Sequence, residues 1–95
     1  MRLYSIKDKT AELFGNVYMF VNDDVAKRTI SGAVANPEHN YGMFPQEFEL
    51  YCVGDFNDKT GLIEISTGVP NKDEWYPVLV CNLEELKAPE NDNAQ

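Results

Sequence analysis

The segment FELYCVGDFNDKTGLIEI, residues 48–65, has the pattern of two β-strands joined by a tight turn. In its first arm apolar side chains occupy every second position, which predicts one apolar face and one mixed face (Phe48, Leu50, Cys52). The second arm, residues 62–65, is short and rich in β-branched side chains. Between the arms, Asn57 favours a turn and Gly61 accepts a positive φ, so we expect a type I turn closed by a glycine bulge. Because two strands alone are marginal in water, this hairpin must pack on other elements.

The chain before the hairpin predicts two strands and a helix. Residues 2–7 form the first strand, and residues 17–20 the second, with a bend or bulge at Gly15. A continuous strand from Glu12 is the less favoured alternative. Asn22 is a favoured helix N-cap, an apolar stripe follows through residue 34, and the pair Asn36-Pro37 ends the helix.

The remaining segments predict loops, one strand and a last helical turn. Residues 38–45 and 66–77 are expected to be loops, and residues 78–81 form a short apolar strand. Asn82 is expected to cap a helical turn over residues 83–87. From residue 88 the tail APENDNAQ lacks large apolar side chains and is predicted to be a disordered acidic tail.

These elements predict a single small α+β domain over residues 1–87 of the 95-residue chain. The order β-β-α-β-β-β predicts a mostly antiparallel sheet with one amphipathic helix packed on one face. The other face of the sheet is then left for water, a second copy of the chain or a ligand.

The net charge of −8 is distributed unevenly. Residues 1–28 carry five Lys or Arg against four acids, whereas residues 29–95 carry three against twelve. A net acidic protein is repelled by nucleic acid as a whole, so any contact with DNA must come from a local basic patch. The alternative is that the acids keep a small protein soluble.

No constellation of catalytic or metal-ligating residues is recognisable, so we expect neither an enzyme nor a cofactor or metal. The sole histidine, His39, falls in a predicted loop, and Cys52 and Cys81 lie inside apolar runs that favour buried thiols over a disulfide. The N-terminus lacks the apolar run of a signal peptide, and no stretch is long enough to span a membrane. We therefore expect a protein of the cytosol in which it is made.

Aromatic side chains beside positive charge are the remaining signal. Proteins that bind single strands combine a basic groove with aromatic rings on which bases stack. The candidate contacts to phosphate are Arg2, Lys7, Lys9, Lys27 and Arg28. The candidate rings for base stacking are Tyr4, Tyr18 and Tyr51. The alternative for each tyrosine is half-buried packing in the sheet.

A second hypothesis is a role in protein interaction or assembly. The acidic residues 29–95 suit a basic partner protein, and the aromatic pair Trp75 and Tyr76 is a candidate anchor. For the DNA-binding hypothesis we expect a homodimer, in which the edge or the second face of the sheet joins the partner.

The sequence also resembles the small nonstructural protein of gokushoviruses, single-stranded DNA phages of the Microviridae. The resemblance spans roughly residues 2–66 and runs through the pieces YSIKD (4–8), Phe14, ND (22–23), AKR (26–28), NP (36–37), Pro45, FELYCVGDF (48–56) and TG (60–61). It implies a phage protein of the bacterial host cytoplasm that binds single-stranded DNA without sequence specificity, supports viral DNA synthesis or packaging, and is not an enzyme. It supplies no binding residues, and under the second hypothesis it implies that the basic partner is a viral or host protein.

Overall fold

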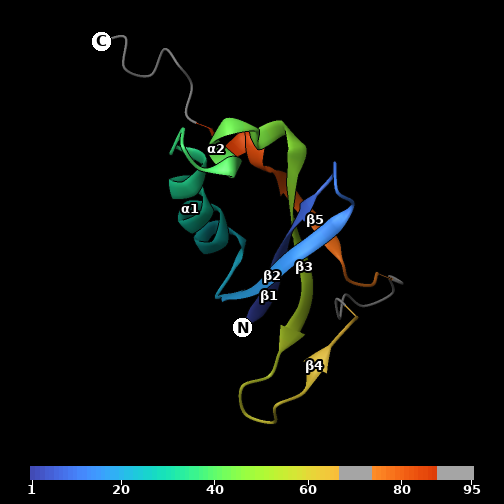
Figure 1. The fold of residues 1–95 in the computed structure, drawn as a ribbon. Helices are drawn as coiled ribbons and strands as arrows, with labels where there is room; N and C mark the ends of the chain where they lie inside the picture. Colours follow the sequence, from blue (N-terminus) through green and yellow to red (C-terminus); the bar gives the residue numbers. More distant parts are fainter. Residues whose placement is uncertain (67–73, 88–95) are drawn as a thin grey trace.

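The computed structural model describes residues 1–66 and 74–87, which form an α+β domain (Figure 1). Within these residues the antiparallel sheet has five strands in the order β2-β1-β3-β4, with β5 also paired to β3. The strands are β1 (Arg2–Asp8), β2 (Leu13–Phe20), β3 (Phe48–Phe56), β4 (Ile63–Glu64) and β5 (Val78–Asn82). The helical segments are α1 (Asp23–Val34), α2 (Asn40–Met43) and the 3₁₀ turns η1 (Pro45–Glu47) and η2 (Leu83–Leu86). The predicted fold class is confirmed.

Strand β3 is the spine of the sheet, since β1 pairs along one edge while β5 and β4 share the other. The predicted alternation is confirmed, because Phe48, Leu50 and Cys52 are buried. The turn to β4 also follows the prediction: the Asn57 side chain accepts hydrogen bonds from backbone N–H groups, and Gly61 has a φ of 78°.

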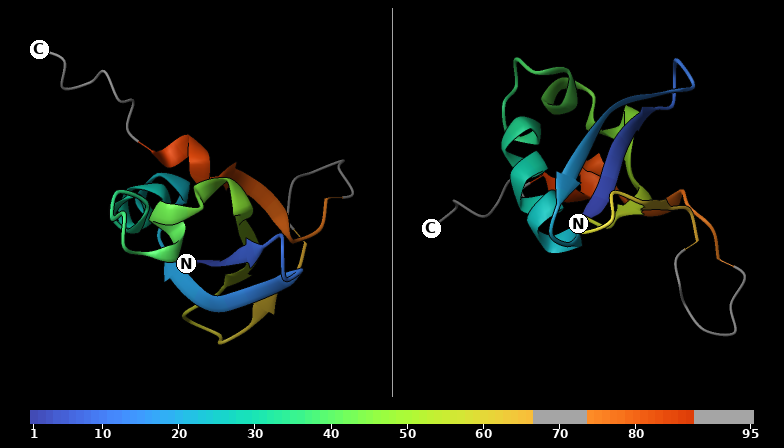
Figure 2. Two further views of the ribbon diagram at one scale, coloured as in Figure 1. Left: turned by 45° about the horizontal axis from the view of Figure 1, so that its top comes forward. Right: turned by 90° about the horizontal axis from the view of Figure 1, so that it is seen from below.

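Helix α1 packs its apolar stripe on one face of this sheet (Figure 2). Its N-cap is Asn22, whose side-chain oxygen accepts from the Val25 N–H at 2.9 Å. The buried side chains Ala26, Ile30 and Val34 join the core formed with β1, β3, β5 and η2. The predicted helix and its cap are therefore confirmed.

Strand β2 begins earlier than predicted. It runs continuously from Leu13, so the shorter strand over residues 17–20 is wrong. The bulge at Gly15 is present: β2 uses one residue more than β1 between the pairs Ser5–Val17 and Lys7–Phe14. The strand continues through this bulge, whereas the prediction took Gly15 as the point before which no strand forms.

The predicted loop over residues 38–45 instead contains α2 and leads into η1. His39 caps α2, since its Nδ1 accepts a hydrogen bond from the Tyr41 N–H at 3.1 Å. Gly42 lets α2 sit directly on the end of α1: a Cβ at Gly42 would lie 1.8 Å from the carbonyl oxygen of Asn36. A helix of four residues depends on such tertiary contacts, which local sequence does not display.

The C-terminal part agrees with the prediction as far as the structure describes it. Strand β5 pairs with β3, and Asn82 precedes η2, where Glu85 Oε2 accepts from the Asn82 N–H at 3.0 Å. Cys52 and Cys81 are buried free thiols, as expected. The predicted tail, residues 88–95, lies outside the described residues.

Candidate nucleic-acid interface

The face of the sheet opposite α1 carries the strongest candidate site. The register places Lys7 opposite both Glu49 and Phe14, and Ser5 opposite both Tyr51 and Val17. We call this surface the open face, because several of its apolar side chains are exposed (Phe14, Val17, Met19 and Leu79). Among the described residues it is thus an apolar surface without a covering helix.

A ring pair with an adjacent cation lies on the open face. The rings of Phe14 and Tyr51 meet edge to face with their centroids 5.3 Å apart. Lys7 Nζ lies 5.8 Å from the centroid of Phe14, within cation–π range. The bulge in β2 is what brings Phe14 opposite Lys7. An exposed ring (Phe14), a half-buried ring (Tyr51) and an ammonium group are the minimal parts of a platform for a stacked base and its phosphate.

A carboxylate borders this platform. Tyr51 donates a hydrogen bond to Glu49 Oε1 at 3.1 Å, which holds the phenol ring in place. Partial burial and this hydrogen bond raise the pKa of Tyr51. Glu49 also faces Lys7 across the strand pair, so the open face offers little net positive charge.

The five cations predicted to contact phosphate do not form one patch. Lys7 lies on the open face, and Lys9 follows in the turn after β1. Arg2 is half buried and pairs with Asp23 at 3.5 Å. Lys27 and Arg28 lie on α1, on the opposite side of the sheet from Lys7. The structure therefore brings only Lys7 and Lys9 near the same end of the sheet.

Tyr4 is a core residue, so its predicted stacking role is wrong. Its side chain is fully buried, and its hydroxyl donates to Asp23 Oδ1 at 2.6 Å. The Arg2 guanidinium lies 5.9 Å from the centre of its ring. Burial, followed by the hydrogen bond to Asp23, raises the pKa of Tyr4 well above its ordinary value. A ring packed into the core cannot accept a base.

This buried phenol predicts loss of stability in alkali. The pKa of the Tyr4 hydroxyl is higher in the folded state than in the unfolded state, where it is about 10. The hydroxyl therefore contributes its full amount to the free energy of unfolding below pH 10 or so, and this contribution declines as the pH rises toward the pKa of the folded state. We expect Tyr4→Phe to lower the free energy of unfolding by about 1 kcal/mol at pH 7, and by progressively less above pH 10 or so. Urea titrations of both proteins between neutral and alkaline pH measure this difference. A difference that stays constant with pH would contradict the assignment, since Tyr41, Tyr51 and Tyr76 titrate in both proteins.

The other two tyrosines, Tyr18 and Tyr51, lie on opposite faces of the sheet. Tyr18 pairs with Tyr4 in the β1–β2 ladder and so faces the helix side, where its ring is near Phe20. Only Tyr51 of the three lies beside Lys7 on the open face.

The two predicted anchors for a protein partner, Trp75 and Tyr76, differ in their exposure to solvent. Trp75 is 59% exposed and forms an isolated bridge with Ser66. Tyr76 is partly buried against the core, and its N–H donates to the Ile65 carbonyl at 2.8 Å. Of this pair, Trp75 alone presents most of its side chain to solvent.

Sequence reasoning missed Phe14, which contributes the second ring. Phe14 was placed before the second strand, and the alternation that would show its face is broken by the bulge at Gly15. The less favoured alternative, a continuous strand from Glu12, would have identified Phe14, because it places this residue beside the first strand.

The described residues contain neither a metal-binding cluster nor a helix that could span a membrane. In residues 1–66 and 74–87, no group of three or more His, Cys, Asp or Glu is arranged to hold a metal ion. None of the helices formed by those residues is both long and apolar enough to cross a bilayer.

Comparison with known proteins gives one match. Residues 1–86 match the family described as Phage ORF5 protein. No curated protein and no solved structure matches the chain.

Proposed function

The chain belongs to the Phage ORF5 protein family, and from this premise we propose that it binds single-stranded DNA through the open face of its sheet. In this proposal it is a noncatalytic protein of a gokushovirus-type phage, acting in the bacterial host cytoplasm during viral DNA synthesis or packaging. The resemblance of residues 2–66 to the nonstructural protein of those phages supports this finer assignment.

The observation that carries the proposal is the contact between the exposed ring of Phe14 and the half-buried ring of Tyr51, with Lys7 beside it. Every base has a π-face, so aromatic platforms bind single strands with little sequence preference. The surrounding apolar side chains, Val17 and Met19, extend the contact area for unstacked bases. Lys7, with Lys9 in the adjacent turn, is placed to meet the phosphate backbone.

The charge of the protein determines what kind of binding to expect. The net charge is −8, and Glu49 offsets Lys7 on the face itself. Stacking must then supply most of the affinity, and few counterions are released from DNA. We expect a shallow dependence on salt, with a slope of about −0.7 for each phosphate contacted on a single strand.

Removing either ring should weaken DNA binding. Each stacked base contributes about 1–3 kcal/mol, so Phe14→Leu or Tyr51→Leu should raise the Kd for a fluorescent oligothymidylate by roughly 5- to 150-fold. Leucine keeps the position apolar. The matched control is Phe44→Leu, which removes another exposed phenyl ring near α2, and it should leave the Kd unchanged. Fluorescence anisotropy measures the affinities, and light scattering in parallel reports whether the predicted dimer forms.

Lys7→Gln tests the phosphate contact in the same assay. It should weaken binding and reduce the salt slope by about 0.7, whereas Lys59→Gln in the β3–β4 turn should do neither. Absence of binding at low salt would refute the proposal. If Lys27→Gln and Arg28→Gln weaken binding while Lys7→Gln has no effect, the strand lies on α1 and the open face is not the site.

A further inference from the structure

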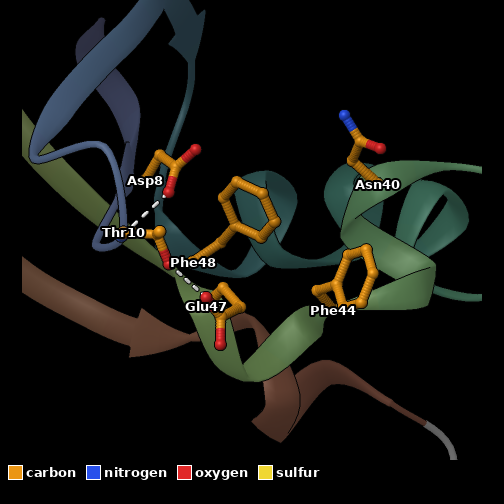
Figure 3. A pocket seen from close by; sticks show the side chains of 6 residues that line it. All are labelled: Asp8, Thr10, Asn40, Phe44, Glu47 and Phe48. Atoms are coloured by element: carbon orange, nitrogen blue, oxygen red, sulfur yellow. Dashed lines mark hydrogen bonds between the residues drawn. The ribbon is translucent and has the colours of Figure 1, made fainter.

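A groove lies at the end of the sheet where Lys7 and Lys9 also lie, between the β1–β2 turn and α2. Its largest part is a hollow of about 410 Å³. Figure 3 shows the side chains that line it: Asp8, Thr10, Asn40, Phe44, Glu47 and Phe48. An adjoining hollow shares Asp8, Asn40 and Phe48 with it, and its lining also includes Phe14, His39 and Tyr41. The groove thus extends beyond the size of a single side chain.

Two carboxylates line this groove, and neither has an ion-pair partner among residues 1–66 and 74–87. Asp8 Oδ1 accepts from the backbone N–H groups of Thr10 and Ala11, and Glu47 Oε1 is bonded to the Thr10 hydroxyl. These bonds fix both carboxylates but use one oxygen of each. No ion pair involves Asp8 or Glu47 in the part of the chain that the structure describes, although Lys9 is close by in sequence.

Phenyl rings flank the carboxylates. Phe44 is 50% exposed at the end of α2, whereas Phe48 is largely buried at the floor of the hollow. Aromatic faces attract guanidinium and ammonium groups, and carboxylates form charge-assisted hydrogen bonds with them. This combination suits the side chain of Arg or Lys, whose methylene stem packs on apolar surface while its charge meets the acids.

We propose that this groove binds an extended segment of a basic protein, with an Arg or Lys side chain held by Asp8, Glu47 and Phe44. Nucleic acid is disfavoured there because its phosphates would meet two carboxylates. A second copy of this chain also carries −8, so it complements this groove less well than a cationic protein does, and the expected homodimer would form through another surface. The same net charge steers a cationic partner toward the groove. The inference does not depend on DNA binding, because the three residues that would hold the basic side chain (Asp8, Glu47 and Phe44) are not among the proposed DNA contacts, although Phe14 lines the adjoining hollow.

The probe is a fluorescein-labelled nonapeptide with arginine and alanine in alternation, measured by anisotropy at an ionic strength of about 0.15 M, where exposed charges are well screened. Asp8→Asn with Glu47→Gln keeps the hydrogen-bond acceptors and should raise the Kd about tenfold or more, the loss expected for charge-assisted bonds. The charge-matched control, Asp58→Asn with Glu64→Gln on the β3–β4 hairpin, should change it less than about twofold. Phe44→Leu should also weaken binding, whereas Tyr51→Leu should not.

Several outcomes would overturn the inference. Equal losses in the two double variants would mean general attraction to an acidic protein, and no binding by the unmodified protein would mean no such site. Amide chemical shifts of the unmodified protein provide a readout without substitution: the peptide should perturb Thr10, Asn40 and Phe44. Shifts confined to Val17 and Tyr51 would place the peptide on the open face. A concentration-dependent mass that falls when peptide is added would show that a second copy occupies the groove.

Discussion

Gly42→Ala should lower the free energy of unfolding by about 3 kcal/mol, a large share of the stability of a small domain. The added methyl carbon would lie 1.8 Å from the Asn36 carbonyl oxygen and 2.6 Å from its carbon. Both are backbone atoms, so no side chain can rotate away to make room. Either α2 lifts off the end of α1 or the substituted chain stays unfolded.

Gly32→Ala is the matched control for this substitution. Gly32 lies within α1, and a Cβ there would meet nothing within 4 Å. Alanine should then stabilise the helix by about 0.5–1 kcal/mol, because glycine loses more backbone entropy on folding. Urea titrations followed by circular dichroism measure both changes. Equal effects of the two variants would show that α2 does not pack on α1 as described.

Leu50→Ala is expected to cost about 2–5 kcal/mol, since Leu50 is fully buried at the centre of β3. The cost combines the lost burial with the cavity left among the sheet, α1 and η2. For a domain of this size, each kcal/mol lowers Tm by roughly 4–8 °C. Leu62→Ala removes the same atoms from a side chain that is 64% exposed, and it should change stability by less than about 0.5 kcal/mol.

Comparison of the Tm values of the two leucine variants tests directly whether Leu50 is in the core and Leu62 is on the surface. If Leu62→Ala proves as damaging as Leu50→Ala, the hairpin side chain is buried in solution, for example in a dimer, and a concentration dependence of Tm would reveal it. A small effect at Leu50 would contradict the assignment of β3 as the spine of the core.

Elements that depend on local signals could be predicted from the sequence. The alternation in β3, the Asn57–Gly61 turn and the Asn22 cap each rest on neighbouring residues, and the structure contains all three. Helix α2 could not be predicted, because four residues with a glycine have weak intrinsic helicity and are held by contact with α1.

The candidate site was harder to predict than the fold. Charge and aromatic content identified Lys7 and Tyr51, but the face to which a strand residue points depends on register. One bulge in β2 decides that Phe14 joins them, and the pairing with β2 sends Tyr18 to the helix side. Tyr4 looked similar in sequence, yet its position between α1 and β3 buries it. The scatter of the cations is likewise a property of the assembled fold.

The bulge in β2 also bears on how the protein avoids aggregation. In the described part of the chain β2 ends the sheet, and all its residues except Phe20 are exposed. A long, flat, apolar strand in that position is a template onto which another chain can add and so begin a fibril. The extra residue near Gly15 disrupts the regular ladder and increases the local twist. The irregularity that places Phe14 opposite Lys7 therefore also makes this exposed edge a poorer template for strand addition by a second chain.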